Sequence, residues 1–589
     1  MYTDKEKLRW LWGRTKGYHL LYFMSLIGIM ICGVMQLTVA VFTQNIVDRF
    51  LTGSNAKLNM QQHQNVFIML ILGMVLLTFL RSVIEYAACM GTEKVSQHVL
   101  NSVRDDLFYK VQHQDMRFYD QYRTGDLMTR LTGDLDAIRH MLAWVIRSIC
   151  DCFSLYMSSM IYFLYLDLEV AVAIFVFTPI IFAVILRFKN KIGPLHGALR
   201  EQLSQLNTAA QENISGNRVV KAFAREDYEI QRFDERNKAY LEANKKTILT
   251  WIKYFPIIEG CANMLPVVLI VFGGMKMIDG TLTGGEYIAF ASLIWAVTVP
   301  MRMLGNVLNE FQRFSAACNK VMELEASEPS IVDQENAIDH PQRFDGKIEF
   351  RNVSFSYGKK KVLEDINFVV EPGQTVAIMG ETGSGKTSLI NLLPRFYDPD
   401  SGNVLIDGMD VKDLKSKQLR KNIGMATQDI LLYSDTIDGN IAFGDSAMSE
   451  EKVKKYAKDA AADEFIEKLP LGYDTIIGER GVGLSGGQKQ RISLARALAI
   501  EPSILVLDDT TSAVDMETEH YIQEQLKQLE FPCTKLIIAQ RISSTKDADM
   551  ILILKDGKIV ERGTHQELVA QEGYYYDIYQ LQGGGESIG

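Results

Sequence analysis

The residues with the clearest chemical meaning form one glycine-rich octapeptide after a short apolar strand. It reads Gly380, Glu381, Thr382, Gly383, Ser384, Gly385, Lys386, Thr387 and matches GxxxxGK[ST], between the strand TVAIM and a helix that begins with Ser388. Glycines in this context let backbone N–H groups surround phosphates, and the helix N-terminus adds positive potential. We therefore expect the octapeptide and Ser388 to bind a nucleotide. Within this set, Lys386 is expected to reach the β- and γ-phosphates, and Thr387 to bind magnesium.

A second signal is the apolar run Ile504-Leu505-Val506-Leu507, which ends in the carboxylate of Asp508. Many buried strands end in Asp, so this pattern is weak by itself. Combined with the octapeptide, it predicts that Asp508 lies beside the phosphate loop and helps to hold magnesium.

Between these two motifs lies a second small-residue turn that opens a helix. It consists of Leu484, Ser485, Gly486, Gly487 and Gln488, followed by KQRISLARALAI. This sequence resembles the signature of the ATP-binding cassette (ABC) family. The resemblance implies that two cassettes pair head to tail, so that this turn takes a phosphate bound to the facing chain. It also implies that Tyr357 stacks on adenine, that Gln428 contacts magnesium, and that Ser512–Asp515 crosses between paired motors.

Two positions depart from the family pattern, and both belong to the hydrolysis step. Asp509 stands where active cassettes carry Glu, and Gln540 stands where they carry His. The Asp509 side chain is shorter by one C–C bond, about 1.5 Å, and misplacement on the order of 1 Å can cost 10²-fold in rate. The resemblance implies that the His of active cassettes contacts the γ-phosphate and orders the water. Gln540 can still hydrogen-bond there but cannot carry the charge of an imidazolium.

These departures predict a site that binds ATP with Mg²⁺ and hydrolyses it poorly. A merely slowed site stays open, because Asp is still a carboxylate that can act as a weak base. Because the signature turn is intact, we expect this chain to complete the competent site of a partner. The predicted partner is a second half-transporter with Glu and His at the matching positions, which makes the assembly a heterodimer.

The remaining sequence indicates how these residues are positioned. After a polar, proline-containing stretch come the runs IEFRNVSF, TVAIMG, SILVLD, TKLIIA and MILIL, which favour a parallel sheet covered on both faces. The predicted fold is an all-α six-helix transmembrane domain with long cytoplasmic helical extensions, followed by an α/β P-loop nucleotide-binding domain. The predicted boundaries are 1–325 for the helical domain, 326–345 for a linker, 346–582 for the cassette and 583–589 for a tail.

Six apolar stretches before the linker predict the membrane spans. The first, 17–47, contains no Asp, Glu, Lys or Arg, and a span needs only ~20 apolar residues. The long segments 94–147 and 187–253 are rich in Lys and Arg, whereas the intervening links hold only Lys57 and Lys276. Because positive loops stay inside, both termini are expected to lie in the cytoplasm. The chain is thus expected to be a multi-pass protein of a bacterial plasma membrane. By resemblance, Phe118–Asp120 and Gly216–Phe223 are expected to be coupling helices that press on the motors.

The net charge and the resemblance indicate which classes of partner this chain has. The chain has 589 residues and a net charge of −10, which argues against nucleic acid as a partner. The resemblance implies an exporter of hydrophobic or amphipathic compounds of the multidrug type, in contact with membrane lipids. A lipid flippase and an ATP-gated channel of the same family stay open. Charged residues interrupt the spans and are candidates for substrate contacts, although helices that extend into the cytoplasm could hold them in water: Arg81, Glu85, Arg147, Asp151, Glu259 and Arg302.

Overall fold

A computed structural model describes residues 2–52, 61–340, 342–478, 481 and 483–582. The predicted link around Lys57 and the tail 583–589 lie outside the described residues. The chain divides into two compact units, which we describe separately. One consists of Met1–His113 and Arg123–Ser327, and the other of Gln114–Tyr122 and Glu328–Gly589.

Long apolar helices make up the first unit. Within the described residues, six helical segments are long and apolar enough to cross a membrane, which confirms the predicted number. They are α2–α3 with a following π-helical turn (His19–Leu51), α5 (Gln64–Gln112), α7–α9 (Thr124–Leu166), α10 (Leu168–Ser215), α12–α13 (Glu226–Ile278) and α14 (Gly284–Ala326). At 1.5 Å per residue, the 49 residues of α5 extend about 74 Å, well beyond a hydrocarbon core of about 30 Å. The predicted helical extensions follow from these lengths.

Several of these segments consist of shorter elements. The bounds are α1 (Asp4–Arg14), α2 (His19–Met35), α3 (Leu37–Ile46), α7 (Thr124–Thr129), α8 (Leu135–His140), α9 (Ile146–Leu166), α12 (Glu226–Val268) and α13 (Gly274–Ile278). π-Helical turns lie at Val47–Leu51, Arg130–Asp134, Met141–Val145 and Leu269–Gly273. The short α1 is tied to α14, because Lys7 Nζ donates to Ser315 Oγ at 2.6 Å and Trp10 Nε1 donates to Glu325 at 2.8 Å.

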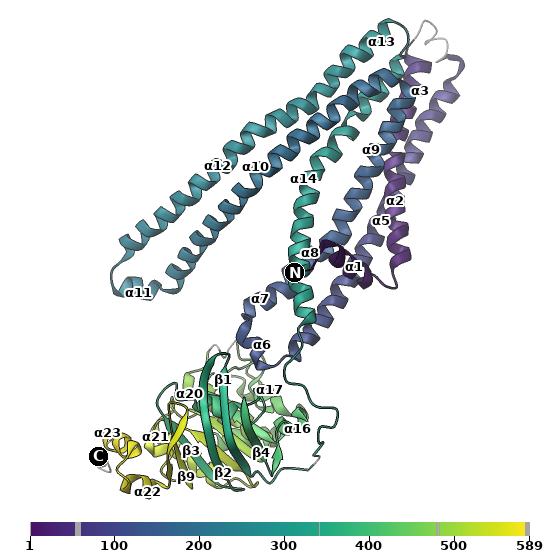
Figure 1. The fold of residues 1–589 in the computed structure, drawn as a ribbon. Helices are drawn as coiled ribbons and strands as arrows, with labels where there is room; N and C mark the ends of the chain where they lie inside the picture. Colours follow the sequence, from purple (N-terminus) through teal and green to yellow (C-terminus); the bar gives the residue numbers. More distant parts are fainter. Residues whose placement is uncertain (1, 53–60, 341, 479–480, 482, 583–589) are drawn as a thin grey trace. The chain divides into compact units, whose positions relative to one another are not determined.

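The helices of this unit pack in two sets. α2 lies against α5 and α9, and α14 lies against α3 and α9; the buried rings of Phe163 and Phe290 meet with centroids 4.8 Å apart. α10 and α12 run side by side to the short α11 (Asn217–Ala222) at their end (Figure 1). Val219 and Phe223, at this end, are 61% and 74% exposed.

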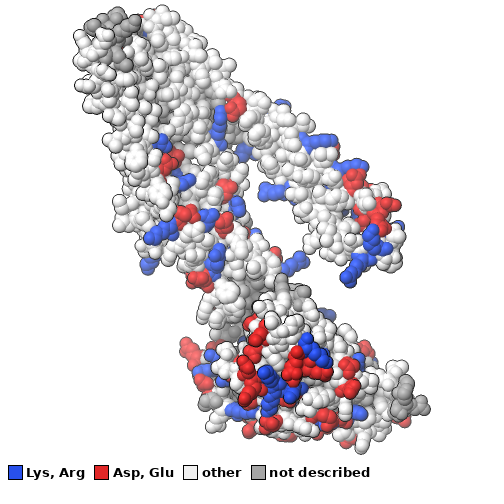
Figure 2. Space-filling model, turned by 180° about the vertical axis from the view of Figure 1, so that it is seen from behind, with Lys and Arg blue, Asp and Glu red and all other residues white. Residues whose placement is uncertain are grey.

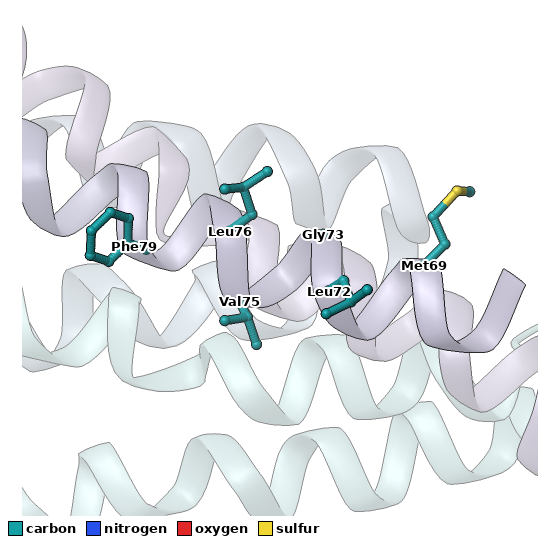
Figure 3. Close-up of a pocket in the computed structure, with 6 residues that line it drawn as sticks. All are labelled: Met69, Leu72, Gly73, Val75, Leu76 and Phe79. Carbon is teal, nitrogen blue, oxygen red and sulfur yellow. The ribbon is translucent and has the colours of Figure 1, made fainter. Parts of the chain in front are cut away.

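Charge is unevenly distributed over this unit. Figure 2 shows charged side chains gathered toward the α11 end, while the opposite end is almost free of them. On α5, a shallow apolar pocket of about 600 Å³ opens to the outside. It is lined by the residues labelled in Figure 3: Met69, Leu72, Gly73, Val75, Leu76 and Phe79. An apolar surface of this kind suits contact with lipid or with another apolar helix.

The charged residues within the spans are mostly paired. Arg81 and Glu85, four residues apart on α5, form an ion pair at 3.6 Å. Arg302 of α14 pairs with Glu259 of α12 at 2.8 Å, a contact between helices that spacing alone could not predict. Arg147 donates to Cys89 Sγ at 2.9 Å.

The second unit contains two sheets. The six-stranded sheet has the order β10-β9-β3-β8-β7-β6, parallel except for the β9–β10 pair, and the four-stranded antiparallel sheet has the order β2-β1-β4-β5. The strands are β1 (Ile348–Tyr357), β2 (Lys360–Val370), β3 (Thr375–Gly380), β4 (Ser401–Ile406), β5 (Met409–Asp410), β6 (Ile423–Ala426), β7 (Ile504–Asp508), β8 (Thr534–Ile538), β9 (Met550–Lys555) and β10 (Lys558–Gly563).

One strand prediction is wrong. The run IEFRNVSF forms β1 of the antiparallel sheet rather than part of the parallel one. The physical reason lies in Arg351 and Asn352, which are both exposed. A strand buried on both faces does not carry two adjacent polar residues, and Asn352, with φ +50°, also interrupts the register with β2. The other four runs form β3, β7, β8 and β9 as predicted.

The parallel sheet is covered on both faces, as predicted. One face packs against β1 and β2 through a cluster that includes Phe350, Phe355 and Ile378, and the other packs against α17, α18 and α20. The helices are α6 (Met116–Gln121), α15 (Lys386–Asn391), α16 (Ser416–Lys421), α17 (Ile437–Ile441), α18 (Glu450–Asp459), α19 (Asp463–Glu467), α20 (Gly486–Ala499), α21 (Met516–Lys527), α22 (His565–Ala570) and α23 (Tyr574–Leu581).

Candidate nucleotide-binding site

The glycine-rich octapeptide lies between β3 and α15, at the carboxyl end of the parallel strands. Gly385 caps α15 with φ +105°, a conformation that glycine adopts at little cost. A Cβ atom at Gly380 would overlap the carbonyl oxygen of Leu554 on the neighbouring strand β9. The loop can therefore take this tight path only with glycine at these two positions.

Lys386 points its ammonium group back into the loop. Nζ donates to the carbonyl oxygens of Gly380 and Glu381, each at 2.8 Å. Burial lowers the pKa of Lys386, and the carboxylates of Asp508 and Asp509 partly oppose this effect. A desolvated ammonium held among backbone groups is well suited to donate hydrogen bonds to phosphate oxygens instead.

Asp508 ends β7 next to this loop, as the sequence predicts. Thr387 Oγ1 donates to Asp508 Oδ2 at 2.9 Å, and Asp508 is only 3% exposed. Burial raises the pKa of Asp508, whereas the hydrogen bond from Thr387 lowers it. A hydroxyl and a carboxylate at this distance fit the protein share of a Mg²⁺ site that phosphate oxygens complete.

Gln428 follows β6, the next strand in the sheet. The register pairs Ala426 with Leu507, so the segment after β6 and Asp508 leave the sheet at the same edge. Gln428 is exposed there. It thus comes from the strand beside the predicted magnesium ligand Asp508.

Tyr357, predicted to stack on adenine, ends β1 and is 38% exposed. Its ring meets that of Tyr397 at 5.3 Å in a perpendicular arrangement. The Tyr397 hydroxyl in turn donates to Asp120 of α6 at 2.9 Å. Sequence reasoning missed Tyr397; the aromatic pair in RFYDPD was the available signal. One predicted coupling segment is thus linked to the predicted adenine contact through a single ring.

Asp509 and Gln540 leave adjacent strands. The register pairs Asp508 with Ile538, and Asp509 N donates to Ile538 O at 3.0 Å. Asp509 adopts φ +52°, a left-handed conformation that Asp tolerates better than most residues. Gln540 is exposed two residues beyond β8. The two unusual residues therefore lie at the edge of the sheet that carries the glycine-rich loop.

A buried carboxylate that the sequence did not reveal holds the segments around them. Glu519 of α21 is 3% exposed and accepts hydrogen bonds from Thr511 Oγ1 at 3.2 Å, from Arg541 at 3.3 Å, and from Ser544. Thr511 lies two residues after Asp509, and Arg541 and Ser544 follow Gln540. Glu519 therefore connects the two segments whose residues depart from the family pattern.

The signature turn opens α20. Ser485 caps this helix and forms a capping box with Gln488. A Cβ atom at Gly487 would lie 2.7 Å from the carbonyl oxygen of Ala513, whereas one at Gly486 would meet only the Ala513 Cβ at 3.8 Å. The signature turn thus packs against the Ala513 loop, whereas Lys386 contacts the backbone of Gly380 and Glu381. The sequence did not predict that Gly487 lies so close to Ala513.

Comparison with known proteins bears on the whole arrangement. The family model of the ABC transporter transmembrane region matches residues 22–301, and that of the ABC transporter family matches residues 363–512. An uncharacterised ABC transporter ATP-binding protein of Bacillus subtilis, YknU, is 41% identical over 82% of each chain. The chain belongs to the ABC exporter family.

Two further relatives span almost the whole exporter chain. An ATP-dependent lipid A-core flippase of Desulfotalea psychrophila is 33% identical over 98% of this chain and 100% of its own. The solved structure of a bacterial Atm1-family ABC exporter with ATP bound matches with a TM-score of 0.78 and 27% identity, over 96% of this chain and 98% of that one. Six spans followed by one cassette thus form a multi-pass membrane protein whose ATPase domain supports ATP-driven transport.

Proposed function

We propose that this exporter chain is the subunit of a heterodimer whose own ATP site is degenerate. Lys386, Thr387 and Asp508 would hold ATP and Mg²⁺, with Tyr357 on the adenine and Gln428 beside the metal. The observation that carries the proposal is the joint placement of Asp509 and Gln540 at the sheet edge beside Lys386. Every group for binding is present there, and both groups for hydrolysis are altered.

The signature turn supports the second half of the proposal. Ser485 keeps its cap on α20, and Gly487 keeps its close approach to Ala513, so the turn is intact in a chain whose own site is altered. It would supply phosphate contacts to a partner that carries Glu and His. Val219 and Phe223 near α11 are exposed large apolar side chains among charged neighbours. An apolar contact with a charged rim supports docking of that end onto another chain's motor.

The substrates we propose are hydrophobic or amphipathic compounds that leave the cytoplasm through this assembly. A Bacillus subtilis relative, YgaD, whose name assigns it to multidrug export, is 34% identical over 95% of this chain. We propose that both termini lie in the cytoplasm, because the loops rich in Lys and Arg are expected on that side. Lipid is the second candidate substrate, because the lipid A-core flippase of Desulfotalea psychrophila covers the same length. Stimulation of ATPase activity in the reconstituted pair by drugs or by lipids distinguishes the two.

The test of the degenerate site restores the missing groups. The full chain is purified alone, verified as a homodimer, and assayed for ATPase activity with and without Asp509→Glu and Gln540→His. We expect turnover to rise at least ~10-fold in the double variant, because the water is then polarised by correctly placed groups. Lys386→Ala added to this variant serves as the control and is expected to abolish the gain. Wild-type turnover as fast as that of the restored variant contradicts the proposal.

A further inference from the structure

The C-terminal helix α23 contacts the candidate site at both of its ends. At its start, the Tyr574 hydroxyl donates to Glu381 Oε1 of the glycine-rich loop at 3.1 Å. At its end, Gln582 caps the helix and its amide meets the segment after β8. Nε2 donates to the carbonyl oxygen of Gln540 at 2.9 Å, and the backbone N–H of Ile542 donates to Oε1 at 2.9 Å. One side-chain amide thus holds the backbone on either side of Arg541.

This helix is itself firmly anchored. Glu561 of β10 accepts hydrogen bonds from the backbone N–H groups of Tyr574 and Tyr575. Tyr575 is fully buried, and its hydroxyl lies 2.6 Å from His565 Nδ1. Ile542 belongs to the same apolar cluster and is 7% exposed. Gln582 therefore extends from a fixed helix toward a segment that is already partly packed against it.

We propose that Gln582 is a positioning residue for Gln540. Glu519 accepts hydrogen bonds from the side chains of the segment around Arg541, and Gln582 bonds to the backbone of this segment. Gln540 lies between the end of β8 and the residues that these two side chains contact. Without the amide of Gln582, the backbone of Gln540 loses its hydrogen bond from α23. The inference rests on the proposed function in one respect, since it assumes that the Gln540 side chain faces the γ-phosphate.

The hold has a direct structural readout that does not depend on nucleotide. The Ile542 amide is the donor to Gln582, so its hydrogen exchange reports whether the contact exists in solution. In the full chain in lipid nanodiscs, we expect Gln582→Ala to speed exchange at Ile542. Gln582→Glu keeps the size and the acceptor for Ile542 but puts a carboxylate oxygen where the donor to Gln540 O was, so exchange at Ile542 is expected to stay slower than in Gln582→Ala. Gln580→Ala is the matched control, because Gln580 is an exposed glutamine on the same helix.

The functional readout is the preference for ATP over ADP, measured by titrating each with Mg²⁺ into the same protein. Only ATP carries the γ-phosphate, so a positioning role predicts that Gln582→Ala and Gln582→Glu weaken ATP binding and leave ADP binding unchanged. We expect the ratio of affinities to fall about fivefold, the effect of losing one ordinary hydrogen bond. A merely structural role would lower both affinities together or neither.

The role of Gln582 and the assignment of Gln540 to the γ-phosphate can fail separately. Faster exchange at Ile542 with an unchanged ATP/ADP ratio in Gln582→Ala overturns the positioning role, provided that Gln540→Ala itself lowers the ratio. If Gln540→Ala leaves the ratio unchanged, the assignment of Gln540 to the γ-phosphate fails. Exchange at Ile542 then decides alone: faster exchange in Gln582→Ala supports the hold, and unchanged exchange overturns it.

Discussion

Gly487→Ala tests the packing of the signature turn most sharply, because the change adds a single methyl group. That methyl would lie 2.7 Å from the Ala513 carbonyl oxygen, whereas even a C–H···O contact needs about 3.3–3.6 Å. Either the first turn of α20 or the loop at Ala513 must therefore move by more than half an ångström. Overpacking of this kind costs about 1–3 kcal/mol, and the better helix propensity of Ala returns at most about 1 kcal/mol.

Displacement of the signature turn or of the Ala513 loop is expected to lower the ATPase rate of the pair. Both the signature turn and the Ala513 loop are proposed to face the partner, where displacement on the order of 1 Å can cost 10²-fold in rate. We expect Gly487→Ala to lower ATPase activity of the purified pair by about 10- to 100-fold at saturating ATP. ATP binding to the glycine-rich loop of this chain is expected to be unchanged, because Lys386 makes its contacts elsewhere.

Two controls identify the cause. Gly486→Ala places its methyl 3.8 Å from the Ala513 Cβ, an ordinary contact, so its melting temperature is expected to equal or exceed that of wild type. Asp509→Ala alters only the site proposed to be degenerate and is expected to keep most of the pair's activity. Full activity of Gly487→Ala in a verified pair, or a larger loss with Asp509→Ala, would refute the reasoning.

Three further changes separate binding, stability and coupling. Lys386→Ala is expected to weaken ATP binding at this chain's own site while the pair keeps part of its turnover; nucleotide titration and ATPase assays check this, and complete loss of turnover would argue for equivalent sites. Asp508→Asn removes a buried carboxylate whose raised pKa makes its stabilising contribution largest at low pH and lost as pH rises through that pKa, and the amide oxygen can still accept from Thr387. The nucleotide-free variant is therefore expected to melt at a higher temperature than wild type at pH 8 but to lose Mg²⁺-dependent ATP binding, and a lower melting temperature would contradict this account. Tyr397→Phe keeps the ring but removes the hydrogen bond to Asp120, so we expect ATP affinity to stay and substrate-stimulated ATPase activity to fall several-fold; unchanged stimulation would show that this bond does not couple the segments.

The sequence was sufficient where a physical constraint acts on neighbouring residues. An apolar stretch long enough to cross a bilayer, or glycines before a lysine at the start of a helix, is visible locally. The six spans and the glycine-rich turn before Lys386 follow from such constraints. The position of Asp508 beside this turn, 121 residues away from Thr387, was predicted only because the two motifs occur together. The same reasoning failed at Ile348–Tyr357, where apolar residues outweighed the polar pair Arg351-Asn352 that indicates a strand with one exposed face.

Contacts between distant segments were beyond this reasoning. Gln582 and Gln540 are 42 positions apart, and a glutamine in a polar C-terminal stretch has no distinctive spacing. Tyr397 and Asp120 are 277 positions apart. Only the fold brings these side chains together, because the strand order of the sheet decides which loops become neighbours.

The site proposed to be degenerate has a structural connection to the signature turn through Gln490. This glutamine of α20 is 8% exposed. Its Nε2 donates to the carbonyl oxygen of Asp509 at 3.2 Å and to Ser512 Oγ at 3.1 Å, and its Oε1 accepts from the Ala513 N–H at 3.1 Å. A buried amide with all of these partners is expensive to displace, since any broken bond leaves a polar group unsatisfied. A shift of the Asp509 backbone when ATP binds would therefore be passed to the first turns of α20. In the proposed heterodimer, nucleotide held without hydrolysis at this chain's site could in this way set the signature turn for the partner's competent site.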